Sequence, residues 1–227
     1  MGSDWSDKLE MLPWLLGMLI ITSCVHEAGH AWAAWRCGDQ RAYIKTRMSP
    51  LSFSHISLWF TIVIPALLVL FVGFIIGGAR PVQVRTSIGP YRMALVALAG
   101  PMGNFLTAGF SLAIVTGLVH AGVLLPSLAF DTHYSYALFA VGFSIFLGFL
   151  NLIPIPPLDG SRVVAALLPE KVRNLYYSTL TIPGMILLLG GFLILSYVYK
   201  QEFSAATLRA LNGLHRWQLV LRDWIAA

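Results

Sequence analysis

LPWLLGMLIITSCVHEAGHAWAAW, residues 12–35, is an apolar run long enough to cross the hydrocarbon core of a membrane as a single helix. Three ionisable side chains interrupt it, in the motif HEAGH at residues 26–30. Ionisable groups inside a membrane are costly, so function is the default interpretation of such a cluster. A hydrogen-bonded polar cluster that holds helices together is the simpler alternative. The run therefore predicts a transmembrane helix that carries chemistry.

The motif has the pattern H-E-x-x-H, which is typical of zinc hydrolases. His26 and His30 lie four residues apart, so both imidazoles share one helical face and can reach one metal ion. Glu27 lies beside them and can take a proton. A hydrolytic zinc site has three protein ligands and an open position for water, so a third ligand must come from elsewhere in the chain.

Asp159 is the strongest candidate for that third ligand. It ends an apolar span in NLIPIPPLDG, residues 151–160, where the prolines unwind the helix end and free the chain to aim a carboxylate inward. Pro-Leu-Asp-Gly alone is more typical of a surface turn, and the zinc half-site decides in favour of a ligand. His55 is a weaker candidate for a fourth ligand, because two imidazoles and a carboxylate already suffice.

Composition excludes several classes of protein. Hydrophobic residues make up 57% of the 227 residues and charged residues only 11%, against about 25% charged in an average soluble domain. This composition excludes a disordered chain and argues strongly against an ordinary soluble globule. The net charge is +5, but the basic residues are scattered between apolar runs and form no patch. We therefore expect no nucleic-acid partner and interpret the charge as loop charge of a membrane protein.

The apolar runs predict an all-α polytopic membrane protein with one membrane core over residues 1–200 and an amphipathic tail over residues 201–227. The expected core helices cover residues 12–35, 93–119, 137–158 and 176–199, and a small β or re-entrant region covers residues 39–79. Everything after residue 175 fits either one span or a hairpin.

Short strands are expected at residues 42–44 and 52–56 of the β or re-entrant region. An exposed strand edge in region 39–57 could hold an extended substrate by strand addition.

Loop charges predict the topology. Loops 36–57, 80–92 and 160–173 are basic, whereas loop 120–134 contains no Lys or Arg and residues 1–10 are net acidic. Basic loops stay in the cytoplasm, which places the N-terminus outside and the HEAGH motif nearer the cytoplasmic face.

The same rule puts both flanks of the apolar run 58–77 inside. A hairpin that turns near Pro65 satisfies this pattern. A plain span with one misplaced basic loop is the alternative.

Three motifs together resemble the site-2 protease family of intramembrane zinc metalloproteases: HEAGH, AGPMGN at residues 99–104, and NLIPIPPLDG. The resemblance covers roughly residues 20–175. GARPV at residues 78–82 and SPLSFSHI at residues 49–56 are similar to the compact prokaryotic branch without a PDZ domain. The sequence departs from that branch after His55, where an acidic-Pro-Gly sequence is missing.

The resemblance implies a role for each matching residue. His26, His30 and Asp159 match the zinc ligands of the family, with one Zn²⁺ per chain, and Glu27 matches its general base. Asn151 matches an asparagine that positions substrate or stabilises the developing oxyanion. The run 99–104 matches the start of the core helix behind the active site, where its small residues permit close helix packing.

The implied function is zinc-dependent intramembrane proteolysis of transmembrane segments by metal-activated water, in a prokaryotic inner membrane. The expected partners are transmembrane protein substrates, the lipid bilayer and, as a further expectation, a regulatory membrane protein. A catalytically silent scaffold that binds partner transmembrane helices is the main alternative. A metal transporter is a weaker one, because it would favour several weak sites along a path, and only one intramembrane cluster is visible.

Overall fold

The computed structural model describes residues 5–72, 75–122 and 132–198. Its α-helices are α1 (Trp5–Arg36), α2 (Ala42–Thr46), α3 (Ile64–Phe71), α4 (Pro90–His120), α5 (Thr132–Leu152), α6 (Asp159–Leu167) and α7 (Glu170–Val198). Short helical turns η1 (Phe53–His55), η2 (Leu58–Val63) and η3 (Thr86–Ile88) complete it. The described part of the chain contains no strand, so the helical fold class is confirmed there.

Helices α1 and α4 form the centre of the molecule, and α5 and α6 pack against α4. Small residues allow the two central helices to approach closely. A Cβ added to Gly29 would come within 2.5 Å of the Ala99 carbonyl oxygen, and one added to Gly103 would lie 3.1 Å from the Val25 carbonyl oxygen. Residues 99–104 therefore cross the HEAGH motif, although they lie inside α4 and not at its start.

The long helices extend past most of their predicted boundaries. Helix α1 contains all of 12–35 and α4 contains all of 93–119. Helix α5 ends at Leu152, before 158, because the prolines that follow cannot continue it. Helix α7 is continuous from Glu170 to Val198, and the predicted tail 201–227 lies outside the described residues.

The two predicted strands are wrong. Residues 42–46 form α2, in which the Lys45 amide donates to the Arg41 carbonyl (3.2 Å). Residues 53–55 form a 3₁₀ turn, in which the His55 amide donates to the Ser52 carbonyl (3.1 Å). Both segments satisfy their backbone groups locally, and Ile44 is buried against α1 as a helical residue. So short an apolar pattern fits one helical turn as well as a strand.

The segment 58–77 begins and ends at neighbouring positions in the fold. Helical residues 58–71 carry the chain away, and an extended segment brings it back. On its return the Gly78 amide donates to the Phe60 carbonyl (3.1 Å), and the Thr61 hydroxyl donates to the Gly78 carbonyl (2.7 Å). Its two ends thus lie side by side, and the cytoplasmic position of both flanks stays a prediction. The expected turn at Pro65 is wrong, because Pro65 lies in the first turn of α3, where a missing amide hydrogen costs no helical bond.

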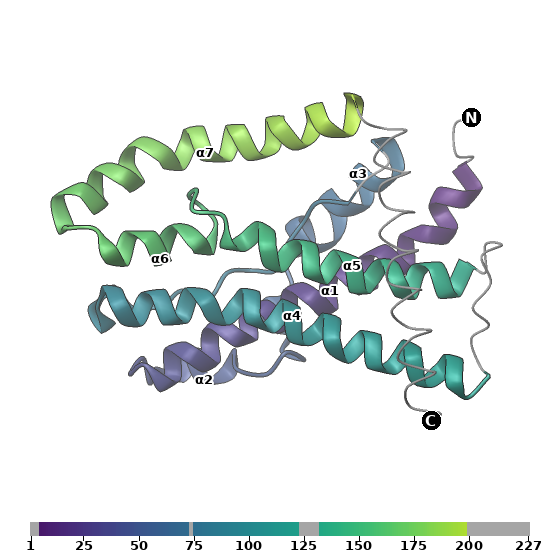
Figure 1. The fold of residues 1–227 in the computed structure, drawn as a ribbon, viewed down its shortest axis with the longest axis horizontal. Helices are drawn as coiled ribbons and strands as arrows, with labels where there is room; N and C mark the ends of the chain where they lie inside the picture. Colours follow the sequence, from purple (N-terminus) through teal and green to yellow (C-terminus); the bar gives the residue numbers. More distant parts are fainter. Residues whose placement is uncertain (1–4, 73–74, 123–131, 199–227) are drawn as a thin grey trace.

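Loops of like charge gather at one end of the molecule. Figure 1 shows the end of α1, the start of α4 and the turn between α6 and α7 at that end, and the start of α1, the end of α4 and the start of α5 at the other. Lys8–Arg36 and Pro90–His120 are long and apolar enough to cross a membrane. Leu58–Phe71 and Ala137–Leu152 are shorter apolar helices.

Candidate metal centre

Three side chains from two helices meet at one point. His26 and His30 lie one turn apart on α1, and Asp159 begins α6. The Asp159 Oδ2 atom lies 3.0 Å from His26 Nε2 and 3.1 Å from His30 Nε2, and the two nitrogens are 3.0 Å apart. The three side chains are between 6% and 11% exposed. Two imidazoles and a carboxylate therefore form a nearly closed, buried triangle.

This triangle has the size that a zinc ion requires. Zinc–nitrogen bonds of about 2.0–2.1 Å in a tetrahedron separate neighbouring ligand atoms by about 3.3 Å, close to the distances found here. His30 is also in the correct tautomer: its Nδ1 donates to the Val96 carbonyl (2.7 Å), and a carbonyl only accepts. The neutral ring that donates from Nδ1 presents the Nε2 lone pair to the triangle. The residues fit a zinc site.

Asn104 of α4 completes the support of the second imidazole. Its side-chain nitrogen lies 3.2 Å from His26 Nδ1, while its Oδ1 is buried without a partner among the described residues. A donating amide would leave the proton of His26 on Nε2, where a metal would bind. Turned over, the amide accepts from Nδ1 through Oδ1, which satisfies the buried oxygen and frees Nε2. A metal at the triangle favours this orientation.

Gly100 gives the two imidazole rings their space. A Cβ added there would lie 2.5 Å from His30 Cε1 and 2.7 Å from His26 Cε1, well inside carbon–carbon contact distance. A residue of any other type would therefore displace the rings. The AGPMGN run therefore leaves space for the imidazole rings, a role that its small residues alone did not predict.

Glu27 is held by the extended segment that follows the 58–77 hairpin. Its Oε2 accepts from the Val82 amide (2.8 Å), and the side chain is buried. Among the described residues Oε1 has no hydrogen-bond partner, which leaves that oxygen available for proton transfer. The candidate ligand atoms of His26, Glu27 and His30 lie within 4.8 Å of one another.

A buried arginine holds the beginning of this segment. Arg47 is 1% exposed and donates to the Ser54 carbonyl (3.0 Å) and to the Arg80 carbonyl. The Arg80 amide in turn donates to the His55 carbonyl (2.6 Å). Two residues before Val82, the chain is thus tied to the 3₁₀ turn.

An ion pair holds the other end of the segment. Arg41 donates twice to the Asp39 carboxylate (2.7 and 2.6 Å) and once to the Gln83 carbonyl (2.7 Å). The Asp39 carboxylate also accepts from the Arg85 amide (2.9 Å). The Arg41 guanidinium, helped by the Arg85 amide, lowers the pKa of Asp39 to about 2. Val82 is therefore fixed from both sides.

Two other candidate residues form their hydrogen bonds outside the triangle. Asn151, in the last turn of α5, donates from its side-chain amide to the Leu147 carbonyl (2.9 Å) of the same helix. His55 is buried in the 3₁₀ turn and its Nε2 donates to the Ser49 carbonyl (3.1 Å). The structure thus brings together His26, His30, Asp159 and Glu27, and it gives the Asn151 amide a partner on its own helix.

Sequence comparisons point to one family. The model of "Peptidase family M50" matches residues 112–193. A Bacillus subtilis (strain 168) protein named "Putative zinc metalloprotease YwhC" is 34% identical over 171 residues, which cover 73% of this chain and 74% of that protein.

Two mycobacterial relatives are longer than the matched region. The "Putative zinc metalloprotease Rip2" of Mycobacterium tuberculosis (strain H37Rv) is 32% identical over 69% of this chain, and that of Mycolicibacterium smegmatis is 34% identical over 71%. The match spans 58% of each Rip2 protein. No solved structure matches the chain significantly.

Proposed function

The chain belongs to peptidase family M50, the site-2 protease family, and from this membership we propose that it is a zinc-dependent intramembrane endoprotease. It would cleave transmembrane segments of other membrane proteins. The observation that carries the proposal is the buried triangle of His26, His30 and Asp159 with Glu27 beside it. Three protein ligands leave the fourth position of a tetrahedral zinc ion open for water, which is the arrangement of hydrolytic zinc sites.

The proposed mechanism assigns one task to each group. Zinc, held by His26, His30 and Asp159, supplies Lewis acidity and an acidified water when it is bound. Glu27 takes the proton of the attacking water and returns it to the leaving amine. The Val82 amide keeps the Glu27 carboxylate in reach of that proton.

Asn151 would bind the substrate carbonyl or stabilise the oxyanion. In that role its amide must exchange the Leu147 carbonyl for the carbonyl of the substrate. An Asn151→Asp variant, which replaces the donor with a carboxylate, is expected to lose cleavage and keep zinc.

An unwound substrate needs a partner for its backbone, and the extended segment around Val84 is the better candidate than region 39–57. In an extended chain, successive residues direct their backbone groups to opposite sides. The Gln83 carbonyl and the Arg85 amide face Arg41 and Asp39. The Val84 amide and carbonyl face the other side and have no hydrogen-bond partner among the described residues.

Val84→Pro tests this step, because it removes the amide donor. We expect slower cleavage with unchanged zinc content. Cleavage at the wild-type rate would contradict strand addition at this segment.

We further propose that the protein lies in a prokaryotic inner membrane with its active site nearer the cytoplasmic face. His26 lies about 15 Å along α1 from Arg36 and about 32 Å from Trp5, at 1.5 Å per residue. The end of α1 nearer to His26 is the end where the basic loops gather (Figure 1). Lipid and transmembrane substrates are the proposed partners, together with a regulatory membrane protein.

The decisive experiment measures zinc content and cleavage of a model transmembrane substrate in detergent for wild type and Glu27→Gln. We expect one zinc per chain in both and cleavage by wild type alone. Zinc in both with cleavage in neither, across several substrates, would instead favour a catalytically silent scaffold. Cleavage by Glu27→Gln would disprove the role of Glu27 as the base.

A further inference from the structure

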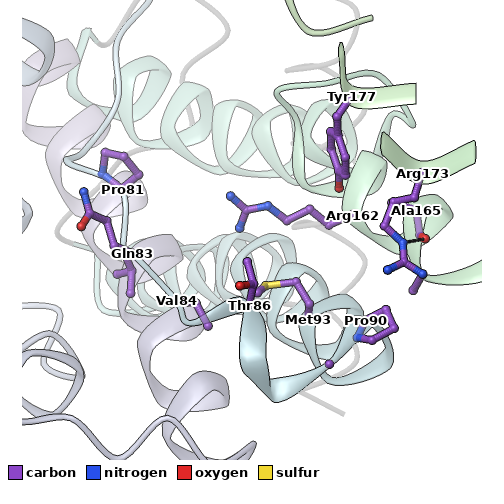
Figure 2. Close-up of a pocket in the computed structure, with 13 residues that line it drawn as sticks. Pro81, Gln83, Val84, Thr86, Pro90, Met93, Arg162, Ala165, Arg173 and Tyr177 are labelled. Atoms are coloured by element: carbon purple, nitrogen blue, oxygen red, sulfur yellow. Dashed lines mark hydrogen bonds between the residues drawn. The ribbon is translucent and has the colours of Figure 1, made fainter. Parts of the chain in front are cut away.

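A cavity of about 510 Å³ shares two of its walls with the metal centre. The segment 81–86, whose last residue begins η3, holds Glu27 through Val82 and forms one wall of the cavity. Helix α6, which begins with Asp159, forms another. The first turn of α4 and Tyr177 of α7 close the remaining sides (Figure 2). A polypeptide that reaches the metal centre along segment 81–86 would pass through this cavity.

Arg162 places a positive charge in the cavity. Figure 2 shows its side chain extending from α6 into the cavity, toward the wall that carries Gln83 and Val84. Arg162 is half-buried and has no hydrogen bond or ion pair among the described residues. The described lining contains no Asp or Glu. A guanidinium in such a place is complementary to a carboxylate, which it can bind through two parallel hydrogen bonds.

The second arginine of the cavity is engaged differently. Arg173 donates to the Ala165 carbonyl and the Leu168 carbonyl, both at 2.8 Å. These bonds satisfy one carbonyl in the last turn of α6 and the carbonyl of Leu168, which follows the helix, so Arg173 has a structural task. Arg162 is therefore the cation of this cavity that is left for a ligand.

We propose that Arg162 binds an aspartate or glutamate side chain of the substrate and so selects substrates with an acidic residue near the scissile bond. The inference rests on the proposed proteolytic function. Arg162 follows Asp159 by three residues, or about 4.5 Å along α6, and an extended substrate advances about 3.3 Å per residue. An offset of about 4.5 Å corresponds to about 1.4 residues of an extended substrate, so the acidic residue lies about one or two positions from the bond that is cut.

The experiment scans one charged residue along a model transmembrane substrate. Asp, Asn or Lys is placed in turn at each of the positions within about four residues of the scissile bond, and kcat/KM is measured. For wild type we expect one position on one side of the bond where Asp is cleaved about tenfold faster than Lys. Arg162→Gln should abolish this difference, and Arg162→Glu should reverse it. Lys171→Glu makes the same charge change on an exposed residue outside the cavity and should keep the wild-type preference.

Binding gives a readout that does not require cleavage. Labelled Asp and Lys peptides are titrated against zinc-loaded Glu27→Gln, with and without Arg162→Gln, and Asp peptides should bind about tenfold tighter only when Arg162 is present. If wild type cleaves nothing, the proposed function fails, and this titration still decides the inference.

The inference is overturned if wild type cleaves without charge preference at every position, or if the preference survives Arg162→Gln. It is also overturned if Arg162→Gln slows all substrates equally in vesicles of anionic phosphatidylglycerol and none in vesicles of phosphatidylcholine. That result would assign Arg162 to a lipid headgroup.

Discussion

Gly100→Ala should separate the imidazoles of the metal centre. The added Cβ would lie 2.5 Å from His30 Cε1 and 2.7 Å from His26 Cε1, whereas carbon atoms in contact are about 3.5–4.0 Å apart. Relief of the overlap requires a movement of about 1 Å by the rings or by α4. Zinc sites tolerate deviations of only about 0.2 Å in ligand distance.

We therefore expect Gly100→Ala to lower zinc affinity by about 10- to 100-fold, equivalent to about 1.4–2.8 kcal/mol. Competition with a chromogenic chelator in detergent measures this affinity, and cleavage at limiting zinc should fall in parallel. Gly109→Ala is the matched control, because it lies on the same helix and its added Cβ meets nothing within 4 Å.

Two results would refute this reasoning. Zinc affinity of Gly100→Ala within twofold of wild type would mean that the rings do not lie against α4 as described. Equal losses in Gly100→Ala and Gly109→Ala would attribute the effect to a general response of α4 to alanine.

Three further perturbations test the groups that surround the ligands. Asn104→Ala removes the partner of the His26 ring and should lower zinc affinity by about 10- to 100-fold in the same chelator assay; unchanged affinity would contradict the contact. Val82→Pro removes the amide that holds Glu27 and should lower kcat with the zinc content intact. A kcat of this variant equal to that of wild type would show that the Val82 amide has no role in catalysis. Asp39 has its pKa lowered from 3.8 to about 2, so its ionised form stabilises the fold above about pH 4 and this contribution is lost as pH falls through about 2. The difference in unfolding free energy between zinc-free wild type and Asp39→Asn should therefore be constant near neutral pH and shrink below about pH 4, as thermal unfolding at each pH would reveal; a constant difference down to pH 2 would contradict the ion pair.

The metal centre could be predicted from sequence where its geometry is local. Helical spacing alone places His26 and His30 on one face. Asp159 required a further argument from the prolines before it. Helix α5 does end at Leu152, shortly before the first of those prolines. The paired flanks of 58–77 were also predictable, because charge counts on either side of an apolar run are independent of its internal structure.

Groups that act through long-range packing could not be predicted. Val82 contributes only its backbone amide, which every residue except proline possesses. Gly100 and Asn104 act through the crossing of α1 and α4, whose register no local pattern specifies. For Asn104 the sequence offered the resemblance of AGPMGN to a family motif and an amide in a run of small and apolar residues, and neither indicated a contact with His26. The prediction of a turn near Pro65 was wrong because proline is as acceptable in a first helical turn as in a loop.

His30 and Asp159 are 129 residues apart in the chain, and this separation has a consequence for biosynthesis. A ribosome that adds about 5–20 residues per second needs roughly 6–26 s to pass from one to the other. Helices α3, α4 and α5 are made during that interval, next to two histidines and a glutamate that still lack their third ligand. The three-residue triangle can therefore close only after most of the helices that surround it have been made.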